Sequence, residues 1–244
     1  MRVALLGATR GIGRAIAREL AGRGDALFLL GRDEAGLARS AGDLTVRGAR
    51  TLGTAHCDLL EPAGFEPALA KVEATLGGLD AVLVCAAIQP PQAELERDPD
   101  ALERMLLVDF VHTVRFCEAA RRRLLARGGG TLCVLSSVAG DRARAPVALY
   151  GAAKAGLSHY LEGLDHAYRG QGLVTVCVKP GFVRTSLTDG LPEPPFAADP
   201  EAVARRVVRA LERPRPVVYA PAVWRLVMAG VRALPRAVLR RVRF

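Results

Sequence analysis

The chain has 244 residues and a mass of 25.9 kDa; half of the residues are hydrophobic and 24% are charged. This length suits a single domain with one sizeable core, and the composition excludes disordered, collagen-like and disulfide-stapled proteins. The net charge of +9 lies entirely in residues 201–244, which hold 11 arginines against two glutamates. Because no base-reading motif accompanies this charge, we expect no nucleic-acid partner and favour an anionic surface such as a membrane.

The five cysteines are scattered along the sequence, with no C-x-x-C pair and no Cys/His cluster at metal spacing. We therefore expect no metal site. Cys85, Cys133 and Cys177 fall in apolar runs, where a free thiol behaves as a small hydrophobe. Reduced, buried thiols favour the cytoplasm. Without a signal peptide or a spanning stretch, the sequence predicts a cytoplasmic protein, either free or peripheral on the inner face of a membrane.

Short apolar runs alternate with longer helical patterns, and the runs are apolar at every position, as strands covered on both faces require. The glycines at 77–78 and 128–130 stop helices just before strands. The sequence thus predicts an α/β fold with a single doubly wound parallel sheet, the Rossmann fold. The expected strands are residues 3–6, 26–30, 81–85, 131–135, 173–178 and 216–219. The proline-rich stretch 191–200 is expected to be a loop or lid next to a site.

A glycine-rich turn follows the first expected strand and leads into a helical pattern. Its first glycine permits a tight turn, and the next two let the backbone approach a pyrophosphate at the positive end of the helix. Taken alone, the motif also fits a strand-to-helix turn that needs glycine only for its shape. Its place at the first strand-helix junction favours dinucleotide binding. The cofactor-binding candidates here are Gly7, Thr9, Arg10, Gly11, Ile12 and Gly13.

The second expected strand ends in Leu29-Leu30-Gly31-Arg32, without an acidic residue at its end. A carboxylate there would bind the ribose 2′-hydroxyl of NAD, whereas Arg32 and Arg10 can converge on a 2′-phosphate. The sequence therefore favours NADP(H) as cofactor. Both arginines also fit a solvated surface, since arginine is the usual cation of this chain, which has 31 Arg and 3 Lys.

Three polar residues form a candidate reacting centre. Ser137 closes the strand at 131–135, and Tyr150 and Lys154 share one helix face because they lie four residues apart. A nearby ammonium favours the phenolate form of a tyrosine. Tyr150 can then exchange a proton with a substrate oxygen that Ser137 holds by a hydrogen bond. The Tyr and Lys alone also fit an exposed helix face that happens to carry them.

These residues resemble the short-chain dehydrogenase/reductase superfamily over residues 1 to about 220. The glycine turn, Asp58, the triad Ser137/Tyr150/Lys154 and the segment 180–185 occur in the family's order. The resemblance implies that Asp58 contacts the adenine, that Tyr150 and Lys154 also serve the cofactor, and that Thr185 lies near the nicotinamide carboxamide. It also implies a homodimer or homotetramer. The remaining implied cofactor contacts are Ala86, Pro180, Gly181 and Val183.

The chain departs from the family at two places. Where the family usually has Asn-Asn-Ala-Gly, this chain has Cys85-Ala86-Ala87-Ile88. The best match to the family's active-site Asn is Asp109, which we include among the candidate catalytic residues. If a backbone carbonyl at this position holds a water molecule of the proton relay, Asp109 replaces Asn with modest loss of activity. If the side chain itself is needed, activity suffers. Asp109 also fits an ordinary buried or capping acid.

The sequence divides into an NADP-binding oxidoreductase domain at 1–219 and a basic, amphipathic extension at 220–244. Pro235 is expected to split the extension into two short helices. Arg225, Arg232, Arg236, Arg240 and Arg243 form a stripe, with Trp224, Val227, Met228, Val231, Leu234, Val238 and Val242 elsewhere. This pattern fits peripheral contact with an anionic membrane and equally a helical pair packed on the body or across a dimer.

The extension also resembles the branch of decaprenylphosphoryl-2-keto-ribose reductases, which reduce a keto-sugar carried on a polyprenyl phosphate. Its matching segments are 218–225 and 234–236, together with 179–185. The leading hypothesis is an NADP(H)-dependent oxidoreductase that interconverts a ketone and a secondary alcohol, with a small-molecule or lipid-linked carbonyl substrate. The alternatives are a general cytosolic carbonyl reductase and a catalytically silent dinucleotide-binding regulator. The length leaves no room for the separate substrate lobe of a sugar-nucleotide epimerase or dehydratase.

Overall fold

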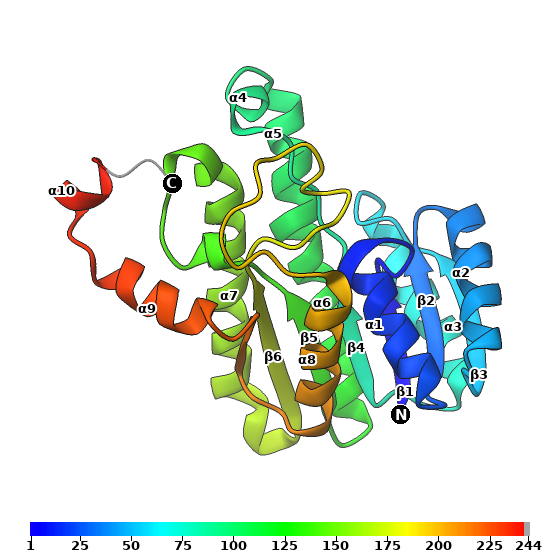
Figure 1. Cartoon of the computed structure of the whole chain (residues 1–244). Helices are drawn as coiled ribbons and strands as arrows, with labels where there is room; N and C mark the ends of the chain where they lie inside the picture. The colour runs from blue at the N-terminus through cyan, green and yellow to red at the C-terminus, as the bar shows by residue number, and fades with distance from the viewer. Residues whose placement is uncertain (242–244) are drawn as a thin grey trace.

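Seven parallel strands form one sheet in the computed structural model, which describes residues 1–241 (Figure 1). The strand order is β3-β2-β1-β4-β5-β6-β7. Strands β2 and β3 extend the sheet to one side of β1, and β4 to β7 extend it to the other side. This arrangement confirms the doubly wound α/β fold predicted from the sequence. The strands are β1 (Arg2–Leu6), β2 (Ala26–Gly31), β3 (Thr51–His56), β4 (Ala81–Val84), β5 (Gly130–Leu135), β6 (Leu173–Pro180) and β7 (Val217–Ala220).

Helices cover both faces of the sheet (Figure 1). One face packs against α1 (Gly11–Gly22), α2 (Glu34–Val46) and α8 (Pro200–Glu212). The other packs against α3 (Phe65–Leu76), α6 (His112–Ala126) and α7 (Ala148–Tyr168). The shorter elements are η1 (Pro62–Gly64), α4 (Gln92–Leu95), α5 (Pro99–Leu106), the π-helical turn η2 (Leu107–Val111), η3 (Val138–Gly140), η4 (Ala145–Val147), η5 (Arg169–Gln171), α9 (Trp224–Ala233) and α10 (Arg236–Leu239).

The uniformly apolar strands are explained by the two layers of core. Along β1, Val3 and Leu5 pack into the layer under α1 and α8, whereas Ala4 and Leu6 pack into the layer under α3 and α6. Successive side chains of a strand point to opposite faces, so both faces must be apolar when helices cover both. A fully buried leucine contributes roughly 1.5–3 kcal/mol, which makes these central strands the main source of stability.

Strand β3 is the one element of the sheet that the sequence pattern missed. It lies at the edge and pairs only with β2. Gly53 sits in its middle because a side chain there would lie 2.5 Å from the ring of Phe28 on β2. Glycine in a strand marks such a close approach, and it interrupts the apolar run by which strands are recognised.

One expected loop and one expected break between helices are confirmed. The proline-rich stretch 191–200 lies in the long connection between β6 and α8, and Pro200 begins α8. Pro235 separates α9 from α10, so the extension forms two short helices that project from the body beyond β7 (Figure 1). Arg243 and Val242, which the sequence placed in the extension's two faces, lie outside the described residues. Within residues 1–241, no helix combines the length and apolar character needed to cross a bilayer.

Candidate active site

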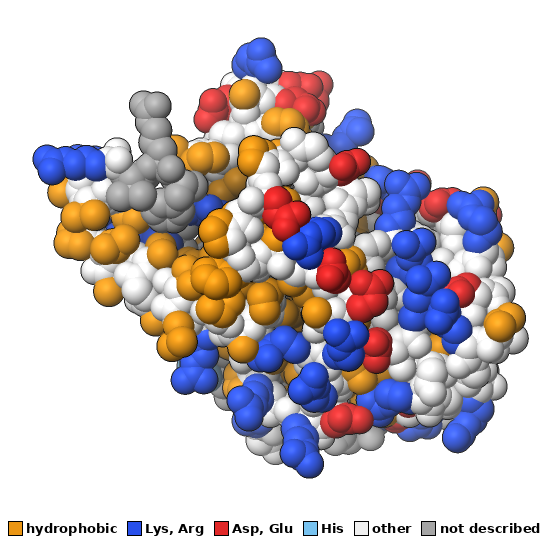
Figure 2. All heavy atoms as spheres, in the orientation of Figure 1, with side chains coloured by type: hydrophobic (Ala, Val, Ile, Leu, Met, Phe, Trp, Pro, Cys, Tyr) orange, Lys and Arg blue, Asp and Glu red, His pale blue; other side chains and the backbone are white. Residues whose placement is uncertain are grey.

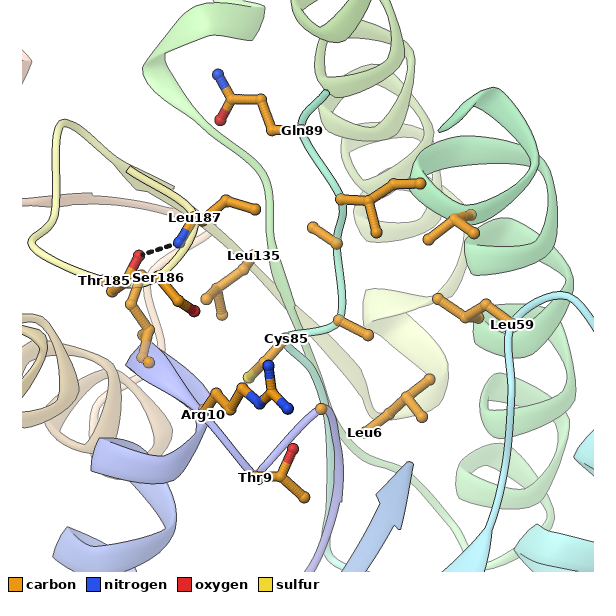
Figure 3. A pocket seen from close by; sticks show the side chains of 18 of the residues that line it. Leu6, Thr9, Arg10, Leu59, Cys85, Gln89, Leu135, Thr185, Ser186 and Leu187 are labelled. Atoms are coloured by element: carbon orange, nitrogen blue, oxygen red, sulfur yellow. Dashed lines mark hydrogen bonds between the residues drawn. The ribbon is translucent and has the colours of Figure 1, made fainter. Parts of the chain in front are cut away.

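A cavity of about 570 Å³ opens at the carboxyl ends of the parallel strands. This is the edge at which doubly wound sheets bind ligands. All the site residues proposed from the sequence line this cavity except Asp109. They are Gly7, Thr9, Arg10, Gly11, Ile12, Gly13, Arg32, Asp58, Ala86, Ser137, Tyr150, Lys154, Pro180, Gly181, Val183 and Thr185. Figure 3 shows Thr9 and Arg10 from the turn after β1, Cys85 from the end of β4 and Thr185 from the segment after β6 around one hollow.

The turn between β1 and α1 has the shape that a bound pyrophosphate needs. Gly7 has φ +89°, and a Cβ on it would lie 2.6 Å from the backbone nitrogen of Ala86. A Cβ on Gly13 would lie 2.1 Å from the carbonyl oxygen of Gly7. Arg10 occupies the N-cap position of α1, and its side chain makes no capping hydrogen bond. The first N–H groups of α1 are therefore available for an anion. These features fit a dinucleotide.

The end of β2 carries charges of both signs. Arg10 and Arg32 are exposed and line the same cavity. Asp33 also lines it, and its carboxylate lies 3.9 Å from the guanidinium of Arg10 and 3.9 Å from that of Arg39. The same carboxylate accepts the N–H of Gly36 at 2.8 Å and thereby caps α2. Sequence reasoning overlooked Asp33, although an aspartate before a helical pattern is a strong N-cap signal.

Ser137 and Tyr150 reach the cavity from neighbouring elements. Ser137 follows β5 and accepts the N–H of Ala139 through its Oγ at 3.1 Å, which leaves its own proton free to donate. Tyr150 lies in the first turn of α7 and is 7% exposed. Burial raises the pKa of Tyr150, and the charge of Asp109 adds to this, while Lys154 and Ser137 act in the opposite direction. Lys154 therefore acts as expected on Tyr150, but burial prevails.

Asp109 lies behind the cavity wall and pairs with Lys154. Its Oδ2 is 3.2 Å from Lys154 Nζ, and the two side chains are 0% and 2% exposed. Its Oδ1 accepts the N–H of Ile88 at 2.8 Å. Burial lowers the pKa of Lys154, but Asp109 and Tyr150 outweigh this and raise it, so the ammonium is retained. Burial also raises the pKa of Asp109. The charge of Lys154 and the hydrogen bond from the Ile88 N–H lower it, but burial prevails.

The π-helical turn η2 places Asp109 at this position. The turn interrupts the path from α5 to α6, and Thr113 donates its hydroxyl to the carbonyl of Val108 at 2.7 Å. Such wide turns often occur at functional sites because they redirect one side chain. Sequence reasoning gave no signal of this turn.

Further lining residues lie outside the motifs. Gln89 and Leu187 line the cavity from the segments after β4 and β6, and Figure 3 shows Leu187 beside Thr185, whose hydroxyl accepts the Leu187 N–H at 3.3 Å. Cys85 lines it just after β4, and burial raises the pKa of its thiol to about 12. Their residue types carry no chemical signature, so only the tertiary structure could find them. Among the described residues, no group of His, Cys, Asp or Glu could hold a metal ion.

The fold and this cavity define a Rossmann protein with a dinucleotide-binding turn and a Ser-Tyr-Lys set at one edge of its sheet. Residues 2–195 match the family model described as short chain dehydrogenase. The chain therefore belongs to the short-chain dehydrogenase family, whose members are oxidoreductases that use a nicotinamide dinucleotide.

Several relatives cover nearly the whole chain. An uncharacterized oxidoreductase of Streptomyces coelicolor is 38% identical over 98% of this chain and 94% of its own length. One from Mycobacterium tuberculosis is 33% identical over 98% and 96%. The cis-4-hydroxycyclohexanecarboxylate dehydrogenase of Sinomonas cyclohexanicum is 33% identical over 90% and 87%. These relatives support the family, and their names do not point to a keto-sugar reductase.

Two solved structures share the fold. A variant of actinorhodin polyketide ketoreductase with NADPH has a TM-score of 0.80 at 23% identity, covering 89% of this chain and 95% of its own. An alcohol dehydrogenase from Thermococcus sibiricus, in complex with 5-hydroxy-NADP, has a TM-score of 0.78 at 26% identity, covering 90% and 94%.

Proposed function

We propose that the protein is an NADP(H)-dependent oxidoreductase that reduces a ketone to a secondary alcohol, or catalyses the reverse reaction. One observation carries this proposal: Ser137, Tyr150 and Lys154 line the same cavity as the glycine turn of β1 and α1. When bound, the dinucleotide supplies or accepts the hydride. Ser137 donates a hydrogen bond to the substrate oxygen, and Tyr150 donates a proton to it during reduction.

Two arginines support NADP(H) over NAD(H). Arg10 and Arg32 are exposed at the cavity beyond β2, where charge-assisted bonds to a 2′-phosphate are possible. Asp33 does not cancel this preference because its carboxylate faces the α2 backbone and the cations Arg10 and Arg39. The two similar structures, which hold NADPH and 5-hydroxy-NADP, add support.

The catalytic assignment is tested with Tyr150→Phe. We expect NADPH-dependent reduction of a panel of ketones by the native protein and a loss of about 10³-fold or more in the variant, because the proton donor is removed. A fluorescence titration should show that NADPH still binds. Undiminished turnover would refute the assigned donor. NADPH binding without turnover of any ketone by the native protein would favour the silent regulator.

We further propose that the protein works in the cytoplasm and contacts the inner face of a membrane with a surface formed by its tail and loop. This surface comprises α9, α10 and the loop at 187–196. Its exposed apolar side chains are Leu226 (76%), Phe196 (54%), Leu191 (52%), Val238 (42%) and Leu187 (39%). Figure 2 shows hydrophobic side chains gathered where α9 meets this loop. The five free thiols support a reducing compartment.

Charge favours an anionic bilayer over a second copy of the chain as the occupant of this surface. Residues 220–241 hold five arginines and no acidic residue, and Arg225, Arg232, Arg236, Arg240 and Arg241 are all exposed. A two-fold interface would bring like charges together, whereas anionic headgroups attract them. Within α9, Met228 is buried, whereas Arg225 and Arg232 are exposed.

The same surface supports a lipid-linked carbonyl substrate. The indole of Trp224 packs against Gly181, which lines the cavity, and its ring lies 6.5 Å from that of Phe196. Leu187 belongs to both the cavity lining and the exposed surface. A lipid held in the bilayer would therefore reach the cavity beside these residues. The resemblance of the tail to the polyprenyl-phosphate keto-sugar reductases points to the same class. A higher kcat/KM for a polyprenyl-phosphate keto-sugar than for the lipid-free keto-sugar would support it, and the opposite ranking would favour a general carbonyl reductase.

Vesicle binding tests the docking surface. Arg225→Gln with Arg232→Gln should weaken binding to phosphatidylglycerol-containing vesicles by about 30-fold, since each cation near the surface contributes about 1 kcal/mol. The control pair, Arg47→Gln with Arg50→Gln in the exposed connection between α2 and β3, should leave it unchanged. Equal effects of both pairs, or loss of a dimer in light scattering without any vesicle binding, would overturn the proposal.

A further inference from the structure

The pairing of Asp109 with Lys154 sets this site apart from the family pattern. Where the family resemblance implies a neutral Asn, this chain places a carboxylate 3.2 Å from the only lysine that lines the described cavity. The pair is enclosed, with side chains 0% and 2% exposed. A carboxylate in such surroundings acts on its neighbours with little screening.

One oxygen of Asp109 accepts a hydrogen bond and the other has only the ion pair with Lys154. Oδ1 accepts the Ile88 N–H, and Oδ2 faces the ammonium. The main-chain oxygen of Lys154 is also fixed, by the hydroxyls of Ser136 at 3.0 Å and Ser158 at 2.9 Å. Asp109 therefore fixes the Cys85-Ala86-Ala87-Ile88 segment on one side and Lys154 on the other.

The charges acting on Tyr150 come from few elements. Lys154 lies on the same helix, Asp109 comes from η2, and the hydroxyl of Ser137 comes from the end of β5. From β6, Cys177 acts on Lys154, and burial raises the pKa of this thiol, which stays neutral at neutral pH. An isolated ammonium beside a tyrosine favours the phenolate, and a carboxylate paired with that ammonium offsets part of this effect.

Building on the proposed function, we propose that Asp109 is a positioning residue that neutralises Lys154, keeps Tyr150 in its phenol form and so sets the site for proton donation to a carbonyl. In that direction the Tyr150 O–H bond breaks as the new alcohol O–H bond forms, and the hydride of NADPH reduces the carbonyl carbon. Oxidation of an alcohol needs the phenolate instead. At neutral pH, the neutral pair therefore leaves more of the enzyme in the phenol form, which reduces a ketone, than in the phenolate form, which oxidises an alcohol.

The direct test measures ionisation of Tyr150 without substrate or cofactor. The ultraviolet absorbance of tyrosinate is titrated in the native protein and in Tyr150→Phe, and the difference isolates Tyr150. The same difference is then taken in the background of Asp109→Asn, which restores the family's usual residue. We expect the midpoint to fall by about one pH unit, because a nearby like charge has been removed. An unchanged or higher midpoint would overturn the proposal.

A second variant covers the risk that Asp109→Asn leaves a buried, unpaired ammonium and destabilises the fold. Asp109→Asn combined with Lys154→Met removes both charges, and we expect the midpoint to return to near that of the native protein. A midpoint equal to that of a folded Asp109→Asn, or one well away from the native value, would contradict the neutral-pair argument. These titrations remain interpretable if no ketone is ever turned over, so they fail independently of the proposed function.

An activity profile provides the third measurement. The pH profile for alcohol oxidation should shift to lower pH in Asp109→Asn by about as much as the titration midpoint. A residue with a merely structural role would lower the rate at every pH and leave the profile in place, and that outcome would also count against the proposal.

Discussion

Asp109, behind the cavity wall, forms an almost fully buried ion pair with Lys154. In α9 and α10, by contrast, all the charged residues are exposed arginines, and there is no carboxylate. The buried pair costs desolvation, and its charges act strongly on one nearby hydroxyl. The arginines of the tail are hydrated and screened, so each contributes little to folding and acts mainly on a charged partner. Burial thus decides whether a charge in this protein controls protonation or association.

After Tyr150, the largest effect is expected at Ser137, which is half-buried and lines the same cavity. Replacement by Ala removes the donor to the substrate oxygen, and we expect kcat for ketone reduction to fall about 10²–10³-fold. Steady-state kinetics measure it. Ser158→Ala is the matched control, because Ser158 hydrogen-bonds the Lys154 carbonyl but does not line the cavity. Similar losses in both variants would assign Ser137 a structural role.

An exposed charge should matter only where a ligand reaches it, and Arg32 tests this. Arg32→Ala should weaken NADPH binding by about 10- to 100-fold, as expected for loss of a hydrogen bond to a charged group, and leave NADH binding unchanged. Fluorescence titration with both nucleotides measures the ratio. Arg39→Ala is the control, since Arg39 is also exposed but lies outside the cavity lining. Equal losses for NADPH and NADH would remove the case for 2′-phosphate recognition.

Between the two extremes lies Asp80, which is half-buried. Its Oδ2 accepts the N–H of Arg2 at 2.7 Å and its Oδ1 accepts Arg2 Nε–H at 3.1 Å. Burial raises the pKa of Asp80, but Arg2 outweighs it and the pKa lies below its ordinary value. Asp80→Asn should lower the free energy of unfolding by about 1 kcal/mol at neutral pH.

The pH dependence of that loss follows from the direction of the shift. A lowered pKa contributes stability above the unfolded value of about 4, and this contribution disappears as the pH falls through the folded value. Denaturant unfolding of the native protein and the Asn variant should therefore converge in acid. A difference in the free energy of unfolding that persists in acid would show that the amide destabilises the protein by disturbing packing, and not by removing a charge.

The smallest effect is expected at Glu193, whose carboxylate pairs with Arg184 on the exposed loop. Both side chains are about half exposed, at 51% and 44%. Glu193→Gln should leave the midpoint of thermal unfolding unchanged, because exposed ion pairs contribute little. A clear drop in this midpoint would contradict the rule that burial sets the effect of a charge here.

The sequence determined the sheet, the glycine turn and the Ser137, Tyr150 and Lys154 set, since each depends on local spacing: apolar runs, glycines at a strand end, and two residues one helical turn apart. The two helices of the tail followed in the same way from Pro235. Strand β3 was missed because its place in the sheet depends on the neighbouring Phe28, not on its own apolar residues.

Only the tertiary structure decided the partner of each charge. Asp33, three residues before Gly36, both caps α2 and faces Arg10, and Asp109, 45 residues before Lys154 in the chain, lies against its ammonium. Electrostatic effects depend on distance and burial after folding, and neither is set by local sequence. For that reason the sequence could name Tyr150 as the group that exchanges the proton. It could not say whether the folded protein holds this side chain as a phenol or as a phenolate.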